Sequence, residues 1–163
     1  MVQENQLIED VWDASVKVQE NVYYWHNKPS CTSSKDLDES KPFVVELFCG
    51  CGGTSLGFEM AGYEIALGAD IHSPSISTFR KNHPRSASVL GDIKLVAPEM
   101  VRELIEFHKV DVLIAGVPCQ GFSLNNRKRH DEDERNFLYL EFVRMVTELK
   151  PKVVVLENVS GMN

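Results

Sequence analysis

Two short pairs of residues are the parts of this chain best suited to covalent chemistry. Pro118 and Cys119 follow the apolar run "VDVLIAGV", and Glu157 and Asn158 follow a second run, "KVVVL". A cysteine in a turn can act as a thiolate nucleophile, whereas a cysteine inside a strand is usually a small core hydrophobe. A carboxyl group in the same site can deliver or share a proton. The two pairs together favour nucleophilic catalysis assisted by an acid.

A glycine-rich turn and two aspartates suit a nucleotide-like cofactor. The turn "FCGCGG" contains Gly50, Gly52 and Gly53, which can adopt positive φ and let backbone amides approach a ligand. Asp70 follows the turn by about 20 residues, where a carboxylate can accept hydrogen bonds from both ribose hydroxyls. Asp92 could meet an exocyclic amine on an adenine ring. The glycine spacing is not GxGxxG and disfavours a pyrophosphate site, so we expect an adenosine-bearing cofactor.

Alternating strands and helices must position these residues from residue 43 onward. Apolar runs predict strands over residues 42–49, 64–70, 87–92, 110–118 and 151–158. Helices are predicted over residues 54–63, 73–83, 97–109 and 136–150. We expect Ser73 to cap the second helix and Pro84 to end it. This alternation predicts a doubly wound, mostly parallel α/β sheet, with strands buried on both faces and all candidate residues at its carboxyl edge.

Residues 1–42 differ in pattern from the rest. Apolar residues from Leu7 to Val22 partly fit a helical stripe, and "NKPSCTSSKDLDESKP" resembles a polar linker. We therefore divide the chain into an N-terminal extension, residues 1–42, and a catalytic unit, residues 43–163.

Composition limits the classes of function. The formal net charge of −7 argues against a free-standing nucleic-acid binder. Basic strips occur at residues 80–85 and 127–130, and we interpret the first as a solvated face. The four cysteines lack paired metal-ligand spacing, which predicts no metal site and favours free thiols in a reducing compartment. We expect no signal peptide and no membrane span, because the N-terminus is acidic and the apolar runs are short.

In order along the chain, the motifs resemble the first six motifs of the cytosine carbon-5 DNA methyltransferases. They are "ELFCGCGGTSLGFEMAGY", "GAD", "GDI", "GVPCQGFS", "DERNFLYLEFVRMV" and "KPKVVVLENVSGM", and they lie within residues 43–163. The combination of "PCQGFS" with "ENV" at this separation is highly specific. The resemblance implies a Rossmann-like S-adenosylmethionine-dependent methyltransferase fold, incomplete here with about five of its strands.

The resemblance also assigns roles to residues. For S-adenosylmethionine it implies contacts from Phe48, Gly50, Gly52, Gly53, Asp70, Ile71, Asp92, Ile93 and Leu138. It makes Cys119 the nucleophile, Pro118 its shaping neighbour and Glu157 the acid, with Asn158 beside it. For the substrate it implies a mobile loop that closes over a flipped cytosine in DNA and touches its phosphates, with Gln120, Ser123, Arg127, Lys128 and Arg129.

The family's later motifs, including its target-recognition region, are not visible in this sequence. We therefore expect a fragment or one half of a split enzyme, in which a second polypeptide supplies the rest. An unfinished sheet would leave an edge unpaired, so the chain alone should be marginally stable or should associate.

Two other functions remain open: the same chemistry on transfer RNA, and a non-catalytic relic that binds cofactor or a partner. The glycine spacing disfavours a nicotinamide-dependent oxidoreductase. Family habit suggests restriction–modification, in the cytoplasm and nucleoid if the host is bacterial or phage, and in the nucleus if it is eukaryotic.

Overall fold

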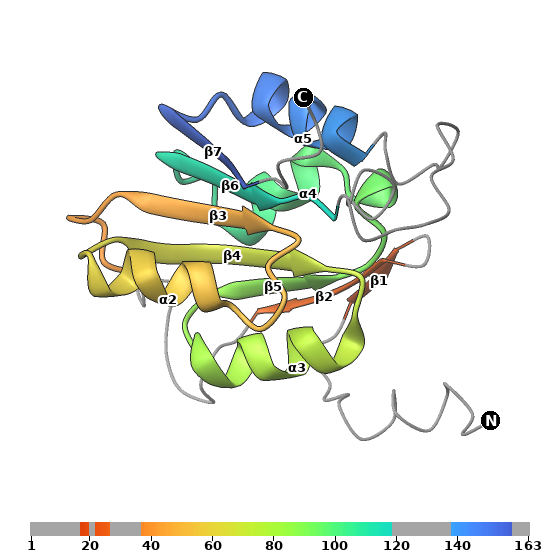
Figure 1. The fold of residues 1–163 in the computed structure, drawn as a ribbon, viewed down its shortest axis with the longest axis horizontal. Coiled ribbons are helices and arrows are strands. Elements are labelled where there is room, and N and C mark those ends of the chain that lie inside the picture. Colours follow the sequence, from red (N-terminus) through yellow and green to blue (C-terminus); the bar gives the residue numbers. More distant parts are fainter. Residues whose placement is uncertain (1–16, 20–21, 27–36, 119–137, 158–163) are drawn as a thin grey trace, which may run out of the picture.

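A seven-stranded sheet runs through the centre of the protein (Figure 1). The computed structural model describes residues 17–19, 22–26, 37–118 and 138–157. The strands, in chain order, are β1 (Lys17–Gln19), β2 (Val22–His26), β3 (Phe43–Leu47), β4 (Glu64–Asp70), β5 (Ala87–Leu90), β6 (Val112–Gly116) and β7 (Val153–Glu157). Their order across the sheet is β1-β2-β5-β4-β3-β6-β7. Strands β5, β4, β3, β6 and β7 are parallel to one another, which confirms the predicted mostly parallel α/β sheet.

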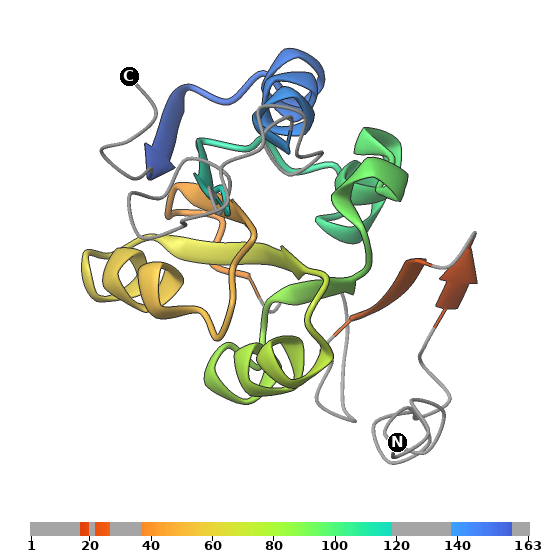
Figure 2. The same ribbon diagram turned by 45° about the vertical axis from the view of Figure 1, so that its right-hand side comes forward.

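Helices cover both faces of this sheet (Figures 1 and 2). They are α2 (Gly53–Met60), α3 (Ser73–Asn82), the short 3₁₀ helix η1 (Ile93–Leu95), α4 (Pro98–Leu104) and α5 (Leu138–Leu149). One core cluster joins Ile76 and Phe79 of α3 to the sheet. A second, larger cluster joins α4 and α5 to its other face. The doubly wound arrangement expected from the alternating pattern is therefore present.

The central strand β3 explains why the candidate residues converge. All five of its residues are buried, because it lies between β4 and β6 and is covered on both faces. The chain leaves β3 toward β4 on one side and returns to β6 on the other. Ligands in open α/β sheets bind at such a switch point, outside the carboxyl ends of the strands.

The N-terminal extension differs from the prediction. Strands β1 and β2 form an antiparallel pair, and β2 pairs antiparallel with β5, with Trp25 opposite Ser88. The helical stripe is therefore wrong for these residues, since the edge of β5 offers backbone partners that a short apolar pattern does not reveal. The extension shares the sheet of the catalytic unit, and the division at residue 42 stays a prediction.

Two helix ends also differ in detail. The N-cap of α3 is His72 rather than Ser73, which is the first helical residue. Helix α4 ends at Leu104, short of the predicted end at residue 109, because Glu106 and Phe107 have φ values of 54° and 60°. A left-handed backbone at the end of a helix redirects the chain and satisfies its last carbonyl groups.

Strand β7 is the largest departure from the expected burial. Val153, Val154 and Leu156 are 52%, 43% and 45% exposed, although the apolar run predicted a strand covered on both faces. Among the described strands, β7 pairs only with β6. On the neighbouring helix α5, Leu140 and Val143 are also exposed. Within the described part of the chain, no helix has the length and apolar character needed to span a membrane.

Candidate functional site

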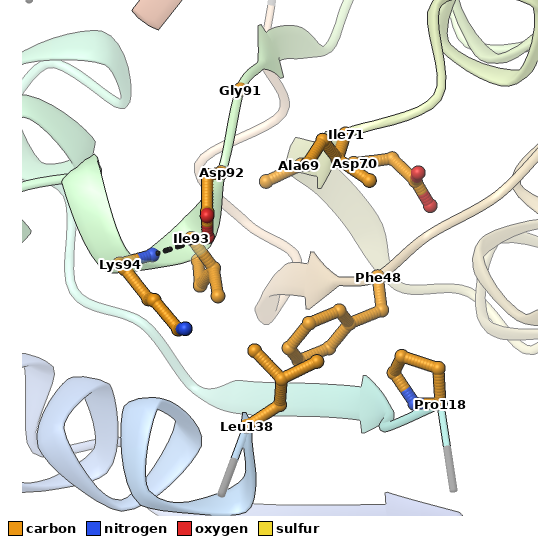
Figure 3. Close-up of a pocket in the computed structure, with 10 residues that line it drawn as sticks. All are labelled: Phe48, Ala69, Asp70, Ile71, Gly91, Asp92, Ile93, Lys94, Pro118 and Leu138. Atoms are coloured by element: carbon orange, nitrogen blue, oxygen red, sulfur yellow. Dashed lines mark hydrogen bonds between the residues drawn. The ribbon is translucent and has the colours of Figure 1, made fainter. Parts of the chain in front are cut away.

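A cavity of about 420 Å³ opens at the carboxyl ends of β3, β4, β5 and β6 (Figure 3). Its lining includes six of the residues predicted to contact the cofactor: Phe48, Asp70, Ile71, Asp92, Ile93 and Leu138. Pro118, the last described residue before Cys119, also lines it. The volume lies in the range of small-molecule sites, which is roughly 300–1,000 Å³.

The walls of this cavity suit a flat apolar ring with polar edges. The side chains of Phe48, Ile93 and Leu138 converge on its interior in Figure 3. Asp70 and Asp92 reach it from the ends of neighbouring strands β4 and β5. An adenosine group would match this distribution: its adenine ring would lie between the apolar side chains, with one carboxylate at the exocyclic amine and the other at the ribose. The residues present therefore fit an adenosine-bearing group.

The carboxylate of Asp70 also ties the glycine-rich turn to β4. Its Oδ2 accepts the N–H of Gly50 at 2.8 Å, and its Oδ1 accepts the N–H of His72 at 2.8 Å. A carboxylate has about four acceptor positions, so each oxygen can still accept a ligand hydroxyl. Asp70 thus joins the turn, the start of α3 and the cavity.

The turn that carries Asp92 is held from two directions. Oδ1 of Asp92 accepts the N–H of Lys94 at 3.0 Å and caps η1. From α5, the guanidinium of Arg144 donates to the carbonyl of Ile93 at 2.9 Å and to that of Val96 at 3.1 Å. These bonds fix the backbone that presents Asp92 and Ile93 to the cavity.

The glycine-rich turn itself has a left-handed backbone. Gly50 and Gly52 have φ values of 53° and 85°, and the N–H of Gly52 donates to the carbonyl of Cys49 at 2.9 Å. Phe48 is also left-handed, at 57°, and turns its ring into the cavity. Gly50, Gly52 and Gly53 do not line the cavity; Gly50 is joined to it through Asp70.

The buried carboxylate of Glu46 holds the start of the helix that follows this turn. Glu46 of β3 is 3% exposed, and its Oε2 accepts the N–H of Ser55 at 3.0 Å and also the Ser55 hydroxyl proton. It caps α2, whose own N-cap, Gly52, has no side chain to do so. Burial raises the pKa of Glu46, while the hydrogen bonds from Ser55 act in the opposite direction.

The predicted acid lies at the same edge but outside the cavity lining. Glu157 ends β7 opposite Gly116 of β6, and its Oε2 is 3.8 Å from the position that a Cβ on Gly116 would occupy. Its side chain is exposed, and Gly116, its partner in the sheet, precedes Pro118 by two residues. The other predicted catalytic and substrate residues lie outside the described part: Cys119, Gln120, Ser123, Arg127, Lys128, Arg129 and Asn158.

Several residues of the site had no sequence prediction. Ala69, Gly91 and Lys94 line the cavity, and they flank residues that were predicted. His83 was placed in a solvated basic strip, and this was wrong, because it is 2% exposed. The described residues contain no group of three side chains that could hold a metal ion.

The family model and the curated relatives that match this chain point to the same family. The family model described as C-5 cytosine-specific DNA methylase matches residues 43–163. The Type II methyltransferase M.XorII of Xanthomonas oryzae is 40% identical over 125 residues, which cover 76% of this chain and 29% of the relative. M.Eco47II of Escherichia coli is 36% identical over 156 residues, covering 96% of this chain and 32% of the relative.

Two solved structures are also similar. A prophage-encoded E. coli protein described as a DNA modification methyltransferase has a TM-score of 0.66 and 38% identity, covering 76% of this chain and 34% of that one. A mutant of Spodoptera frugiperda DNMT2 has a TM-score of 0.55 and 26% identity, covering 74% and 36%. The chain spans about 28% to 49% of the length of the curated relatives it matches.

Proposed function

Because the chain belongs to the family of C-5 cytosine-specific DNA methylases, we propose that it forms the cofactor-binding and catalytic part of a DNA cytosine-5 methyltransferase. One observation carries this proposal: the cavity at the switch point of the sheet has a lining that suits a nucleoside, and the same lining includes Pro118, the neighbour of Cys119. The curated relatives are Type II methyltransferases, which supports a role in restriction–modification within a bacterial cytoplasm.

S-adenosylmethionine is the proposed cofactor, and when bound it supplies an electrophilic methyl group. Asp70 would accept its ribose hydroxyls, and Asp92 with Ile93 would contact its adenine. Phe48, Ile71 and Leu138 would provide the apolar walls. The left-handed turn with Gly50, Gly52 and Gly53 would bring backbone amides close to the rest of the molecule.

Catalysis would begin with the thiolate of Cys119, which adds to carbon 6 of cytosine. Glu157 would hydrogen-bond ring nitrogen 3 and the exocyclic amine, stabilising the charge that the addition places on the ring. Carbon 5 thereby becomes nucleophilic and can be methylated. Loss of its proton and departure of Cys119 then restore the aromatic ring. Pro118 would hold the backbone just before Cys119, and Asn158 would hold it just after Glu157.

DNA is the proposed substrate, and the target cytosine must leave the stack for a thiol to approach carbon 6. Gln120 and Ser123 would contact the flipped base. Arg127, Lys128 and Arg129 would contact phosphates, which contribute affinity without reading sequence. This local basic segment would offset the unfavourable net charge of −7.

Further polypeptide completes the proposed enzyme. The exposed apolar side chains of β7 and α5 and the limited share of each relative that this chain covers support this proposal. That polypeptide could continue from the present residues or belong to a second chain, and it would supply target recognition. Residues 1–42 would act as an extension of the catalytic unit rather than as a reader of DNA.

The test is transfer of tritiated methyl groups from S-adenosylmethionine by the purified chain, with unmethylated DNA and unmodified transfer RNA offered in parallel. Because further polypeptide completes the proposed enzyme, we expect little label from this chain by itself. The same assay is repeated after adding, as a separate chain, the part of a relative that this chain does not match. We expect label in DNA only from this mixture, and none when Cys119→Ser replaces the wild type. Label in RNA alone, or equal label from Cys119→Ser, would contradict the proposal.

A further inference from the structure

Asn82, the last residue of α3, and His83, its C-cap, bind two consecutive carbonyl groups of the glycine-rich turn. The amide nitrogen Nδ2 of Asn82 donates to the carbonyl of Cys51 at 3.0 Å. Nε2 of His83 lies 3.1 Å from the carbonyl of Gly52. A carbonyl oxygen can only accept, so Nε2 of His83 must carry a proton and donate it here. Two adjacent side chains thus hold two adjacent peptide groups, 31 residues away in sequence.

The fit between Gly52 and His83 is close. A Cβ on Gly52 would lie 2.5 Å from Nε2 of His83 and 2.7 Å from its Cδ2, so only glycine fits here. The φ of Gly52, 85°, also disfavours any other residue. The carbonyl of Gly52 accepts a second bond, from the N–H of Leu56 in α2 at 2.9 Å. One oxygen therefore connects α2 to His83.

His83 is itself fixed in place. It is 2% exposed, and its ring lies 4.8 Å from the ring of Phe79, centroid to centroid. Its backbone N–H donates to the carbonyl of Phe79 at 2.8 Å, and its carbonyl accepts the N–H of Ser86 at 3.1 Å. Its Nδ1 lies 3.2 Å from Oε2 of Glu59. The imidazole is thus held on several sides besides its contact with Gly52.

These contacts determine where the N–H groups of the turn point. In a trans peptide the carbonyl and the following N–H point in opposite directions. Because the carbonyl of Gly52 is directed at His83, the N–H of Gly53 is directed away from α3. That N–H belongs to the first residue of α2, where helix amides have no partner within the helix. Earlier in the same turn, the N–H of Gly50 is already used, because it donates to Asp70 of β4 at 2.8 Å.

We propose that Asn82 and His83 are positioning residues that hold Cys51 and Gly52 in the conformation required to bind the cofactor. The proposal rests on the proposed function, since it assumes that this turn binds S-adenosylmethionine. Neither side chain lines the cavity, so neither would touch the cofactor. They would act through the direction of the backbone amides alone.

The variants separate this role from general stability. Asn82→Ala and His83→Leu remove the two donors. His83→Gln is the rescue variant, because its amide nitrogen can reach about as far as Nε2 and donate. Thr78→Ala is the matched control, since it removes a bond of 3.0 Å to the carbonyl of Pro74 within the same helix, α3, without touching the turn.

The first readout is hydrogen exchange of the ligand-free chain, followed by mass spectrometry of peptides covering residues 49–56. We expect exchange in this segment to rise about tenfold in Asn82→Ala and His83→Leu, the effect of losing roughly one hydrogen bond. Peptides from β3 and β6 should keep their rates. His83→Gln should stay near the wild type, and Thr78→Ala should not differ from it. Unchanged exchange at residues 49–56, or an equal rise in every peptide, would overturn the proposal.

The second readout is the Kd for S-adenosylmethionine by calorimetry. We expect it to rise about tenfold in the two donor-removing variants and to recover in His83→Gln. Equal Kd values in all variants, with the wild type binding well, would overturn the positioning role. A wild type that does not bind at all would instead contradict the proposed function, and the exchange data would still decide whether Asn82 and His83 hold the turn.

Discussion

The ring of Phe79 in α3 lies directly against the backbone of Gly68 in β4, and a Cβ on Gly68 would overlap it. Phe79 is fully buried, and it also contacts the ring of His83. The close approach of α3 to the sheet thus depends on two glycines, Gly68 beneath Phe79 and Gly52 beside His83. The position of α3 and the shape of the glycine-rich turn are therefore coupled.

Gly68→Ala should destabilise the fold by about 1–3 kcal/mol, because the added methyl group forces Phe79 out of its position. Gly57→Ala in α2 is the matched control: nothing lies within 4 Å of its Cβ position. Since alanine favours helix more than glycine, the control should gain up to about 1 kcal/mol. Urea unfolding measures both values. A loss of similar size in Gly57→Ala would show that the effect is not specific to Phe79.

Glu46 should make stability depend on pH. Burial raises its pKa in the folded protein, so its stabilising contribution is present below the ordinary pKa of glutamate and is lost as pH rises through the raised value. Glu46→Gln keeps an acceptor for the Ser55 N–H without this titration. We expect the wild type to lose stability relative to Glu46→Gln as pH rises above the ordinary glutamate pKa of about 4.3.

Urea unfolding of both proteins across this range tests the expectation. The difference between them removes the contributions of other shifted carboxyl groups, among them Glu64, whose pKa burial also raises. A constant difference at all pH values would mean that Glu46 holds the same charge in the folded and unfolded chains.

Asp70→Asn should weaken cofactor binding by at least about tenfold, because bonds to a charged acceptor contribute roughly 1.5–3 kcal/mol. The asparagine keeps only one acceptor oxygen for the N–H groups of Gly50 and His72. Asp38→Asn is the control, since Asp38 bonds the nearby Ser40 and lies away from the cavity. Calorimetry with S-adenosylmethionine gives both constants. Equal affinity of the two variants would remove Asp70 from the proposed site.

The two cysteines of the glycine-rich turn should differ in reactivity. Burial, followed by the negative charges of Asp70 and Glu46, raises the pKa of the Cys49 thiol, whereas Cys51 is exposed. Only a thiolate reacts readily with alkylating agents. Iodoacetamide at about pH 8 should therefore label Cys51 and leave Cys49 intact in the folded protein, while both react in urea. Peptide mapping by mass spectrometry measures each, and fast labelling of Cys49 would contradict its burial.

The parallel part of the sheet could be predicted because its strands carry their own signal. β3 and β4 are nearly continuous apolar runs, and the residues that follow them fall at the carboxyl edge in any parallel arrangement. Asp70 and Asp92 could be assigned to a cofactor site because they end successive strands beside the glycine-rich turn, and the family resemblance implies the same role. Their roles in orienting Gly50 and η1 depend on backbone directions that sequence does not contain.

Other features depend on distant partners. His83 lies among charged residues, so it resembles a surface histidine, and its burial follows from a glycine that faces it from another element. The strand character of β2 follows from pairing with β5, since a short apolar run fits either secondary structure. The exposure of β7 could not be predicted because apolarity does not reveal whether a neighbouring element covers the strand.

The pairing of β2 with β5 makes the two edges of the sheet unequal as places where a further strand could be added. Without β2, strand β5 would form the edge of the parallel sheet. Because β2 and β1 are added there, the outermost strand on that side is β1, whose three residues offer few backbone groups for pairing. On the other side, β7 has five residues, four of them apolar and the last of them Glu157. Extension of the described sheet is thus favoured at one edge only. A fluorescent or affinity label attached near β1 would leave the other edge accessible, so assembly with further polypeptide could be followed without being blocked.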